Sequence, residues 1–167
     1  MRKKQAALPA PPIDLESLPG HYIRRLQQIA VALFLLETEA YAVTPVQYAI
    51  LQKVCNVPGI DQRTLARSIG FDTSTVTGVI DRLESRGLLV RNTTPDDRRV
   101  RRLTLTTEGH AHVTAVQPAM RRSQERILEP LSALEREQFM RMLRALVTAN
   151  NSSSRAPSEP SCSVNKP

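Results

Sequence analysis

The chain has few of the residues on which metal, disulfide and cofactor chemistry depends. It contains two cysteines, three histidines and no tryptophan in 167 residues. Cys55 and Cys162 form no disulfide framework or zinc-ligand spacing. His110 and His112 are two residues apart on an expected helix, so their side chains point in different directions. We therefore expect no cofactor and no metal, and we interpret Cys55 as an apolar filler.

Long apolar runs are also absent. No stretch approaches the ~20 apolar residues that span a bilayer. The basic start at residues 2–4 is followed by an Ala/Pro-rich segment and not by an apolar core of signal-peptide length. The sequence has no glycine-rich phosphate loop, no nucleophile elbow and no carboxylate pair in an evident buried setting. We expect a soluble cytoplasmic protein that makes no membrane contact and is not an enzyme.

Positive charge is abundant and concentrated. The chain has a net charge of +7, and 19 of its 23 basic residues are arginines. From Arg86 to Arg102 there are six arginines against two aspartates, a local excess of +4. Phosphate is the natural counter-charge for such a segment. Taken alone, the charge also fits a solvated basic surface.

Residues 60–105 show the order of a winged helix-turn-helix. Asp61 is placed to cap a short helix that Gly70 ends. A second helix follows with four apolar residues at i, i+3, i+4 and i+7, beginning at Val76, and its opposite side carries small polar groups. Two β-prone runs, 88–91 and 100–105, then flank a turn-rich segment. The sequence predicts a DNA-reading helix followed by a β-hairpin wing.

Several motifs in this order and spacing resemble the multiple antibiotic resistance regulator (MarR) family of bacterial repressors. The motifs are Thr44-Pro45-Val46-Gln47-Tyr48-Ala49-Ile50-Leu51, Leu65-Ala66-Arg67, Thr75-Val76-Thr77, Ile80-Asp81-Arg82-Leu83-Glu84-Ser85-Arg86-Gly87-Leu88, Asp97-Arg98-Arg99 and Leu103-Thr104-Leu105-Thr106-Thr107-Glu108-Gly109. The resemblance covers about residues 15–148. Thr94 departs from it, since many members have Asp there. The resemblance implies a mainly α fold with a small β-wing and a transcriptional repressor that binds DNA and responds to a ligand.

Apolar helical faces near both ends suggest how the chain is organised. The central lobe is too small to cover them, so we predict a two-fold homodimer on a palindromic operator, its reading helices about 34 Å apart. A monomeric helical bundle is the alternative. The predicted parts are a disordered arm (1–12), a dimerisation helix (13–43), the DNA-binding lobe (44–106), two dimerisation helices (107–149) and a disordered tail (150–167).

Ten residues are predicted to contact double-stranded DNA. Small groups on the second helix suit base edges, and Arg82 suits guanine. The wing arginines suit phosphate or the minor groove, and the resemblance points to Arg99 as the inserted tip. Capping of the helix is the alternative role for the hydroxyls at 73–75. The ten residues are Arg63, Thr73, Ser74, Thr75, Thr77, Gly78, Arg82, Arg98, Arg99 and Arg101.

The resemblance also implies a small-molecule effector, commonly an aromatic anion. An imidazole and guanidinium groups suit a carboxylate, and we predict that a small aromatic carboxylate or its CoA thioester binds. The predicted ligand residues are His21, Tyr22, Arg24, Arg25 and Tyr48. A salt bridge in the dimer interface or a solvated helix face is the alternative role for the first-helix cluster. Other functions left open are a response to oxidation at Cys55 or to cationic or phenolic toxicants, and a protein-interaction module that does not bind DNA.

The wing assignment yields a direct test. We expect Arg99→Ala to weaken operator binding at least about tenfold and to flatten its salt dependence, because a phosphate-facing cation is lost. Binding measured across a salt series checks this. Unchanged affinity at every salt concentration would contradict the assignment.

Overall fold

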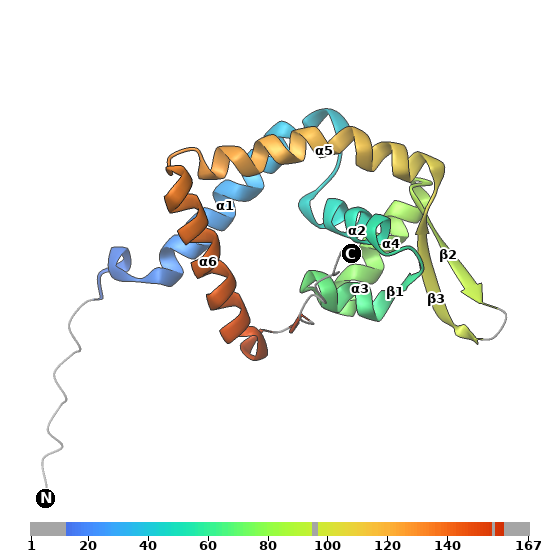
Figure 1. Cartoon of the computed structure of the whole chain (residues 1–167). Coiled ribbons are helices and arrows are strands. Elements are labelled where there is room, and N and C mark those ends of the chain that lie inside the picture. Colours follow the sequence, from blue (N-terminus) through green and yellow to red (C-terminus); the bar gives the residue numbers. More distant parts are fainter. Residues whose placement is uncertain (1–12, 95–96, 155, 159–167) are drawn as a thin grey trace, which may run out of the picture.

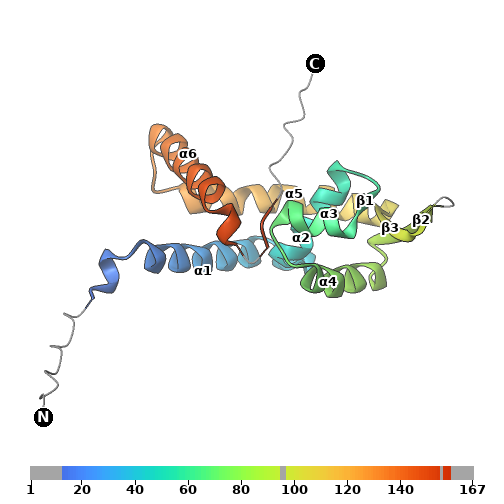
Figure 2. The same cartoon turned by 90° about the horizontal axis from the view of Figure 1, so that it is seen from below.

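The molecule consists of a lobe and, outside it, the helices α1 (Pro19–Glu37), α5 (Thr107–Leu128) and α6 (Ala133–Ala149), which we call the arms. The computed structural model describes residues 13–94, 97–154 and 156–158. Helices α1 and α5 lie side by side, and α6 folds back from the end of α5 (Figures 1 and 2). A short 3-10 helix, Leu15–Ser17, precedes α1. The predicted mainly α fold with a small β-wing is confirmed.

The lobe lies between α1 and α5 in the sequence and ends in the hairpin wing (Figure 1). Its elements are a 3-10 turn (Glu39–Tyr41), α2 (Pro45–Asn56), β1 (Ile60–Asp61), α3 (Gln62–Ile69), α4 (Thr73–Ser85), β2 (Leu89–Thr94) and β3 (Asp97–Leu105). The sheet is antiparallel with the order β1-β3-β2. Strand β1 was not predicted, because two residues are too short to show alternation.

Local capping signals determine where the helices begin and end. Thr44 Oγ1 accepts from the Gln47 amide at 3.3 Å, and Gln47 Oε1 accepts from the Thr44 amide at 3.0 Å, which closes the capping box at the start of α2. Asp61 caps α3 through the Thr64 amide at 2.9 Å. Gly70 ends α3 in the left-handed conformation, with φ of 69°. The predicted caps at Asp61 and Gly70 are confirmed.

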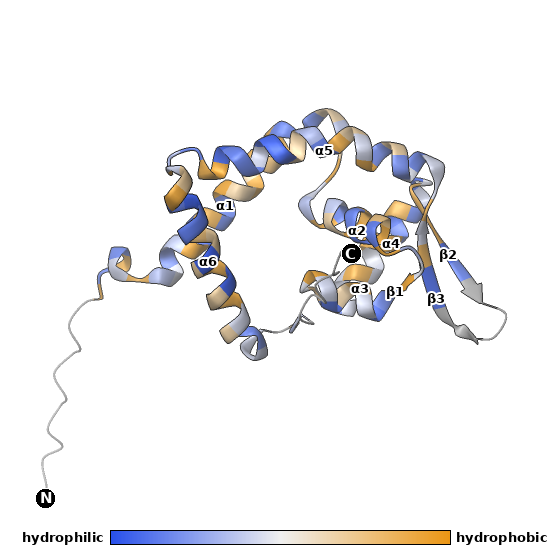
Figure 3. Ribbon diagram, viewed as in Figure 1, coloured by the Kyte–Doolittle hydropathy of each residue, from blue (hydrophilic) through white to orange (hydrophobic). Residues whose placement is uncertain are grey.

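The main hydrophobic core belongs to the lobe. Its fully buried side chains include Ile50, Leu51, Leu65, Ile80, Leu83, Leu89 and Leu103. The arms are different: every residue of α6 stays at least partly exposed, and Tyr22, Ile23, Leu146 and Val147 are each more than half exposed. Figure 3 shows hydrophobic residues along both α1 and α6. These apolar faces remain uncovered in a single chain.

The segment after α6 has local structure where we predicted a disordered tail from residue 150. Asn151–Ser153 form a 3-10 turn. The Asn151 side chain donates to the Ser158 carbonyl at 2.7 Å and accepts from the Ser158 amide at 2.9 Å. An asparagine side chain can make both bonds because it has a donor and an acceptor. The predicted arm at 1–12 and the rest of the tail, 159–167, lie outside the described residues.

The described helices also bear on membrane contact. Over residues 13–94, 97–154 and 156–158, no helix is long and apolar enough to span a bilayer.

The start of α5 offers a test of the packing. A Cβ at Gly109 would lie 1.9 Å from the Leu88 carbonyl oxygen, so we expect Gly109→Ala to lower the free energy of unfolding by about 1–3 kcal/mol. Urea denaturation measures this loss. The control is Gly20→Ala, where a Cβ meets nothing within 4 Å. Equal stability of the two variants would contradict the packing.

Candidate nucleic-acid interface

Helix α4 has a buried face and an outward face. Val76, Val79, Ile80 and Leu83 are buried, as their spacing predicted. We define the outward face as Ser74, Thr75, Gly78, Arg82 and Ser85, which lie away from that core. A Cβ at Gly78 would meet only the Arg82 guanidinium, at 3.9 Å. Apart from Arg82, which is its one cation, the outward face therefore carries only short side chains.

Asp72 organises the first turn of α4. Its carboxylate accepts from the Thr75 amide at 2.7 Å, from the Ser74 hydroxyl at 2.5 Å and from the Thr75 hydroxyl at 2.6 Å. These bonds, chiefly the two hydroxyl bonds, hold the pKa of Asp72 well below its usual range. The N-cap is Asp72, so capping by the hydroxyls at 73–75 is not what starts the helix.

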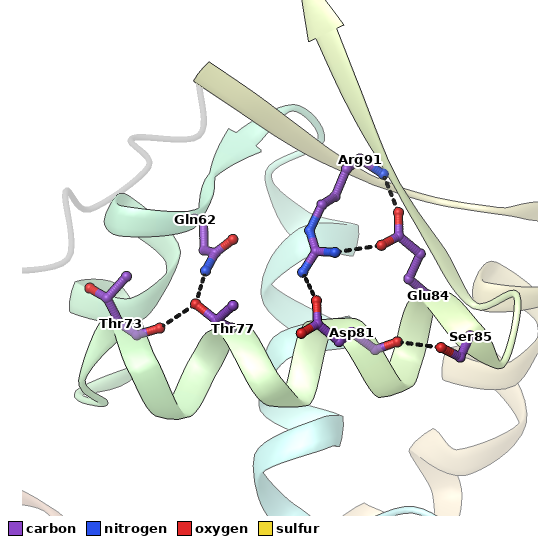
Figure 4. Close-up of polar contacts among 7 residues, drawn as sticks. All are labelled: Gln62, Thr73, Thr77, Asp81, Glu84, Ser85 and Arg91. Atoms are coloured by element: carbon purple, nitrogen blue, oxygen red, sulfur yellow. Dashed lines mark hydrogen bonds and ion pairs between the residues drawn. The ribbon is translucent and has the colours of Figure 1, made fainter. Parts of the chain in front are cut away.

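Thr77 lies on the flank of α4 and ties it to α3. Its hydroxyl donates to the Thr73 carbonyl at 2.7 Å, and Gln62 Nε2 donates to the same hydroxyl (Figure 4). Both bonds use the Thr77 oxygen inside the protein. Thr77 therefore joins two helices, whereas we predicted a base contact. The role of Gln62 was missed because its partner lies 15 residues away and no local pattern indicates it.

Arg91 on β2 attaches the wing to α4. Its guanidinium donates to Glu84 Oε2 at 2.5 Å and pairs with Asp81, and its amide donates to Glu84 Oε1 at 3.2 Å (Figure 4). The Arg91 side chain is only 12% exposed. Arg91 is one of the six arginines in the local excess that we expected to bind phosphate. The structure shows that two carboxylates neutralise it within the protein.

Four further arginines of the lobe have described surroundings. Arg86 donates to the Ala42 carbonyl and Arg102 to the Gly59 carbonyl, each at 3.0 Å. Arg63 and Arg101 are exposed and line an open groove between α3 and β3, with Thr73 at its edge. The structure thus brings together three predicted DNA contacts. The side chains of Arg98 and Arg99 lie outside the described residues.

The predicted ligand residues are in two separate places. His21, Tyr22, Arg24 and Arg25 lie on the first turns of α1, where the His21 and Tyr22 rings pack edge to face with centroids 5.4 Å apart. Arg24 donates to Gln28 at 3.3 Å. Tyr22 and Arg25 also line an apolar groove between α1 and α6.

Tyr48 lies on α2 and contacts the other end of α1. Its ring packs against Phe34 with centroids 6.0 Å apart, its hydroxyl donates to Gln52 at 2.9 Å, and burial raises its pKa. At 1.5 Å per residue, Phe34 lies about 20 Å along α1 from His21. One chain therefore does not bring Tyr48 to the first-helix cluster.

Two histidines of α5 contact different neighbours, as their spacing predicted. His110 Nδ1 lies 3.8 Å from the Cys55 sulfur. His112 is half-buried with Nε2 unpartnered, and its pKa is lowered by burial and then by the charge of Arg86. No local pattern in the sequence indicates that His112 is near Arg86. Within the described ranges, no three His, Cys, Asp or Glu side chains are grouped to hold a metal.

Comparisons with known proteins agree with this geometry. The MarR family model matches residues 43–100. The transcriptional regulator HosA of Escherichia coli O111:H- is 33% identical, over 77% of this chain and 94% of that protein. The regulator PcaV of Streptomyces coelicolor, solved with its natural ligand, is 35% identical with a TM-score of 0.76, covering 84% of this chain and 99% of PcaV.

A third relative has been solved in two complexes. The repressor CouR bound to a 23-mer DNA duplex is 30% identical with a TM-score of 0.76, covering 80% of this chain and 94% of CouR. Bound to p-coumaroyl-CoA, it is 28% identical with a TM-score of 0.74, covering the same shares.

The attachment of the wing can be tested by removing its cation. We expect Arg91→Met to lower the free energy of unfolding by about 1–3 kcal/mol, less than for a fully buried ion pair because Asp81 remains half exposed. Urea denaturation of Arg101→Ala is the control, with a change within about 0.5 kcal/mol because that side chain is exposed. If both variants unfolded alike, Arg91 would not hold the wing.

Proposed function

The chain belongs to the MarR family of transcriptional regulators, and from this premise we propose that it is a dimeric repressor of a catabolic operon. A small aromatic carboxylate or its CoA thioester would release it from a palindromic operator. The outward face of α4 carries the proposal. Its short polar groups and single arginine suit the major groove, and Arg63 and Arg101 beside it suit phosphates.

The uncovered faces of α1 and α6 support a dimer. Exposed apolar side chains such as Tyr22, Ile23 and Val147 would be buried by a second copy of the chain. In a two-fold dimer the same patch of each protomer contacts that of its partner, so the apolar faces of α1 and α6 are covered in both copies. Two α4 helices would then face successive turns of one side of the DNA, as a palindromic operator requires.

The chemistry of the first helix supports an anionic aromatic effector. His21, Arg24 and Arg25 offer charge-assisted hydrogen bonds to a carboxylate, and the neighbouring groove is apolar. The CouR complex with p-coumaroyl-CoA is a precedent for an aromatic thioester in a relative. Tyr48 could complete the same site only between protomers, since it lies far from His21 in one chain.

A contact at the other end of α1 suggests how a ligand would affect DNA binding. Arg86, directly after α4, donates to the Ala42 carbonyl in the segment that joins α1 to α2. A ligand that shifted α1 would therefore pull on the end of α4. Half-buried His112 lies in the electrostatic range of Arg86 and would feel the same shift.

The effector assignment can be tested by fluorescence anisotropy on duplex from the region upstream of the gene, with a panel of aromatic carboxylates and their CoA thioesters. We expect one compound to release the wild-type protein. His21→Ala and Arg25→Ala should require at least about tenfold more of it, the effect of losing one charge-assisted bond. Their DNA binding without ligand is the control and should not change.

The same experiment separates the alternatives. Release at the wild-type concentration in both variants would show that the first-helix site is wrong. Release by peroxide alone would favour Cys55, whose sulfur lies near His110. If no duplex bound in a salt-dependent manner, DNA binding itself would be contradicted.

A further inference from the structure

Four of the five hydroxyl groups along α4 share an unexpected property. Ser74 and Thr75 donate to the Asp72 carboxylate, Thr77 to the Thr73 carbonyl, and Ser85 to the Asp81 carbonyl at 2.8 Å. An ionised carboxylate and a carbonyl can only accept, so the direction of each bond is fixed. All four hydroxyl hydrogens are therefore used inside the protein.

A hydroxyl that has given up its hydrogen presents only lone pairs to a ligand. In the major groove the complementary donors are the N6 amino group of adenine and the N4 amino group of cytosine. Phosphate oxygens, guanine O6 and thymine O4 are acceptors and cannot pair with such a hydroxyl. The Ser74 and Thr75 hydroxyls are thus committed to one kind of base edge, and Arg82 supplies the cation of the outward face.

We propose that Asp72 is a positioning residue for operator specificity: it holds the hydroxyls of Ser74 and Thr75 as acceptors, so that the start of α4 selects exocyclic amino groups. This inference rests on the proposed DNA-binding function. Asp72 does not need to touch DNA itself. Its bonds of 2.5 and 2.6 Å are in the range of charge-assisted hydrogen bonds, which are stronger than neutral ones.

The ionisation of Asp72 keeps this arrangement in place at neutral pH. The same hydroxyl bonds that orient Ser74 and Thr75 also lower the pKa of Asp72, so its carboxylate stays an acceptor. Turning either hydroxyl toward a phosphate would leave the carboxylate short of a donor. It would also bring two anions close together, which opposes that change.

The test is selection of operators from a randomised duplex pool with wild-type protein, Asp72→Asn and Asp61→Asn. Asparagine is as good an N-cap as aspartate, so α4 should still form. However, its side chain is neutral and has one accepting oxygen beside an NH2 group that only donates, so both hydroxyls lose their anionic partner and one of them loses its acceptor. Asp61 caps α3 and accepts from the Thr64 amide and hydroxyl, so Asp61→Asn makes the same change of charge and chemistry off the outward face.

We expect Asp72→Asn to select different bases where the start of α4 lies, and Asp61→Asn to select the wild-type operator. In a second arm, wild-type protein binds operators in which single adenines are replaced by purine, which lacks the amino group, or cytosines by pyrimidin-2-one. At one such position affinity should fall at least about fivefold, the lower range for one base contact. Asp72→Asn should lose less there.

Three results would be decisive against the inference. Removing a negative charge at either position should raise affinity for every duplex by a similar factor. If Asp72→Asn showed only this gain, as Asp61→Asn does, and still selected the wild-type operator, Asp72 would act through charge alone. If no amino deletion weakened the wild-type protein, the hydroxyls would not read amino groups. If wild-type protein selected no operator at all, the proposed function would fail, and this inference with it.

Discussion

The orientation of α4 relative to its neighbours is the constraint on which the DNA-binding geometry depends. Burial of Ile80 and Leu83 fixes which side of the helix faces the lobe, but apolar packing is not directional. Polar contacts on the flank add direction. Gln62 of α3 and Arg91 of β2 reach α4 from the same side (Figure 4). The helix, the wing and α3 are therefore held as one unit that can meet DNA together.

A second set of contacts relates that unit to the arms. Glu37 near the end of α1 accepts from Arg122 and Arg126 of α5, each at 2.9 Å, and these bonds lower the pKa of Glu37. These two ion pairs join the end of α1 to α5. Helix α5 follows β3 closely in the sequence, and Arg86 at the end of α4 contacts the segment after α1. A shift of α1 relative to α5 would therefore act on the lobe at both places.

The elements that could be predicted from the sequence are those whose signals are local. Caps such as Thr44 and Asp61 act within three residues, and the apolar spacing of α4 repeats within two turns. Arg91 was misjudged because a net charge count does not show where a partner lies. Tyr48 was grouped with His21 by chemistry alone, and only the fold shows the length of α1 between them. Contacts between distant segments thus escaped prediction.

The structure also changes what the arginine excess means. Of the four described arginine side chains between residues 86 and 102, Arg91 is neutralised by carboxylates, while Arg86 and Arg102 are held by backbone carbonyls. A carbonyl bond leaves the charge in place but fixes where it lies. Each of these two arginines keeps its charge and its other N–H donors, and Arg102 lines the same groove as Arg63 and Arg101, whereas Arg91 is lost to phosphate. The number of phosphates neutralised, and hence the salt dependence, is set by fewer cations than the sequence count suggests.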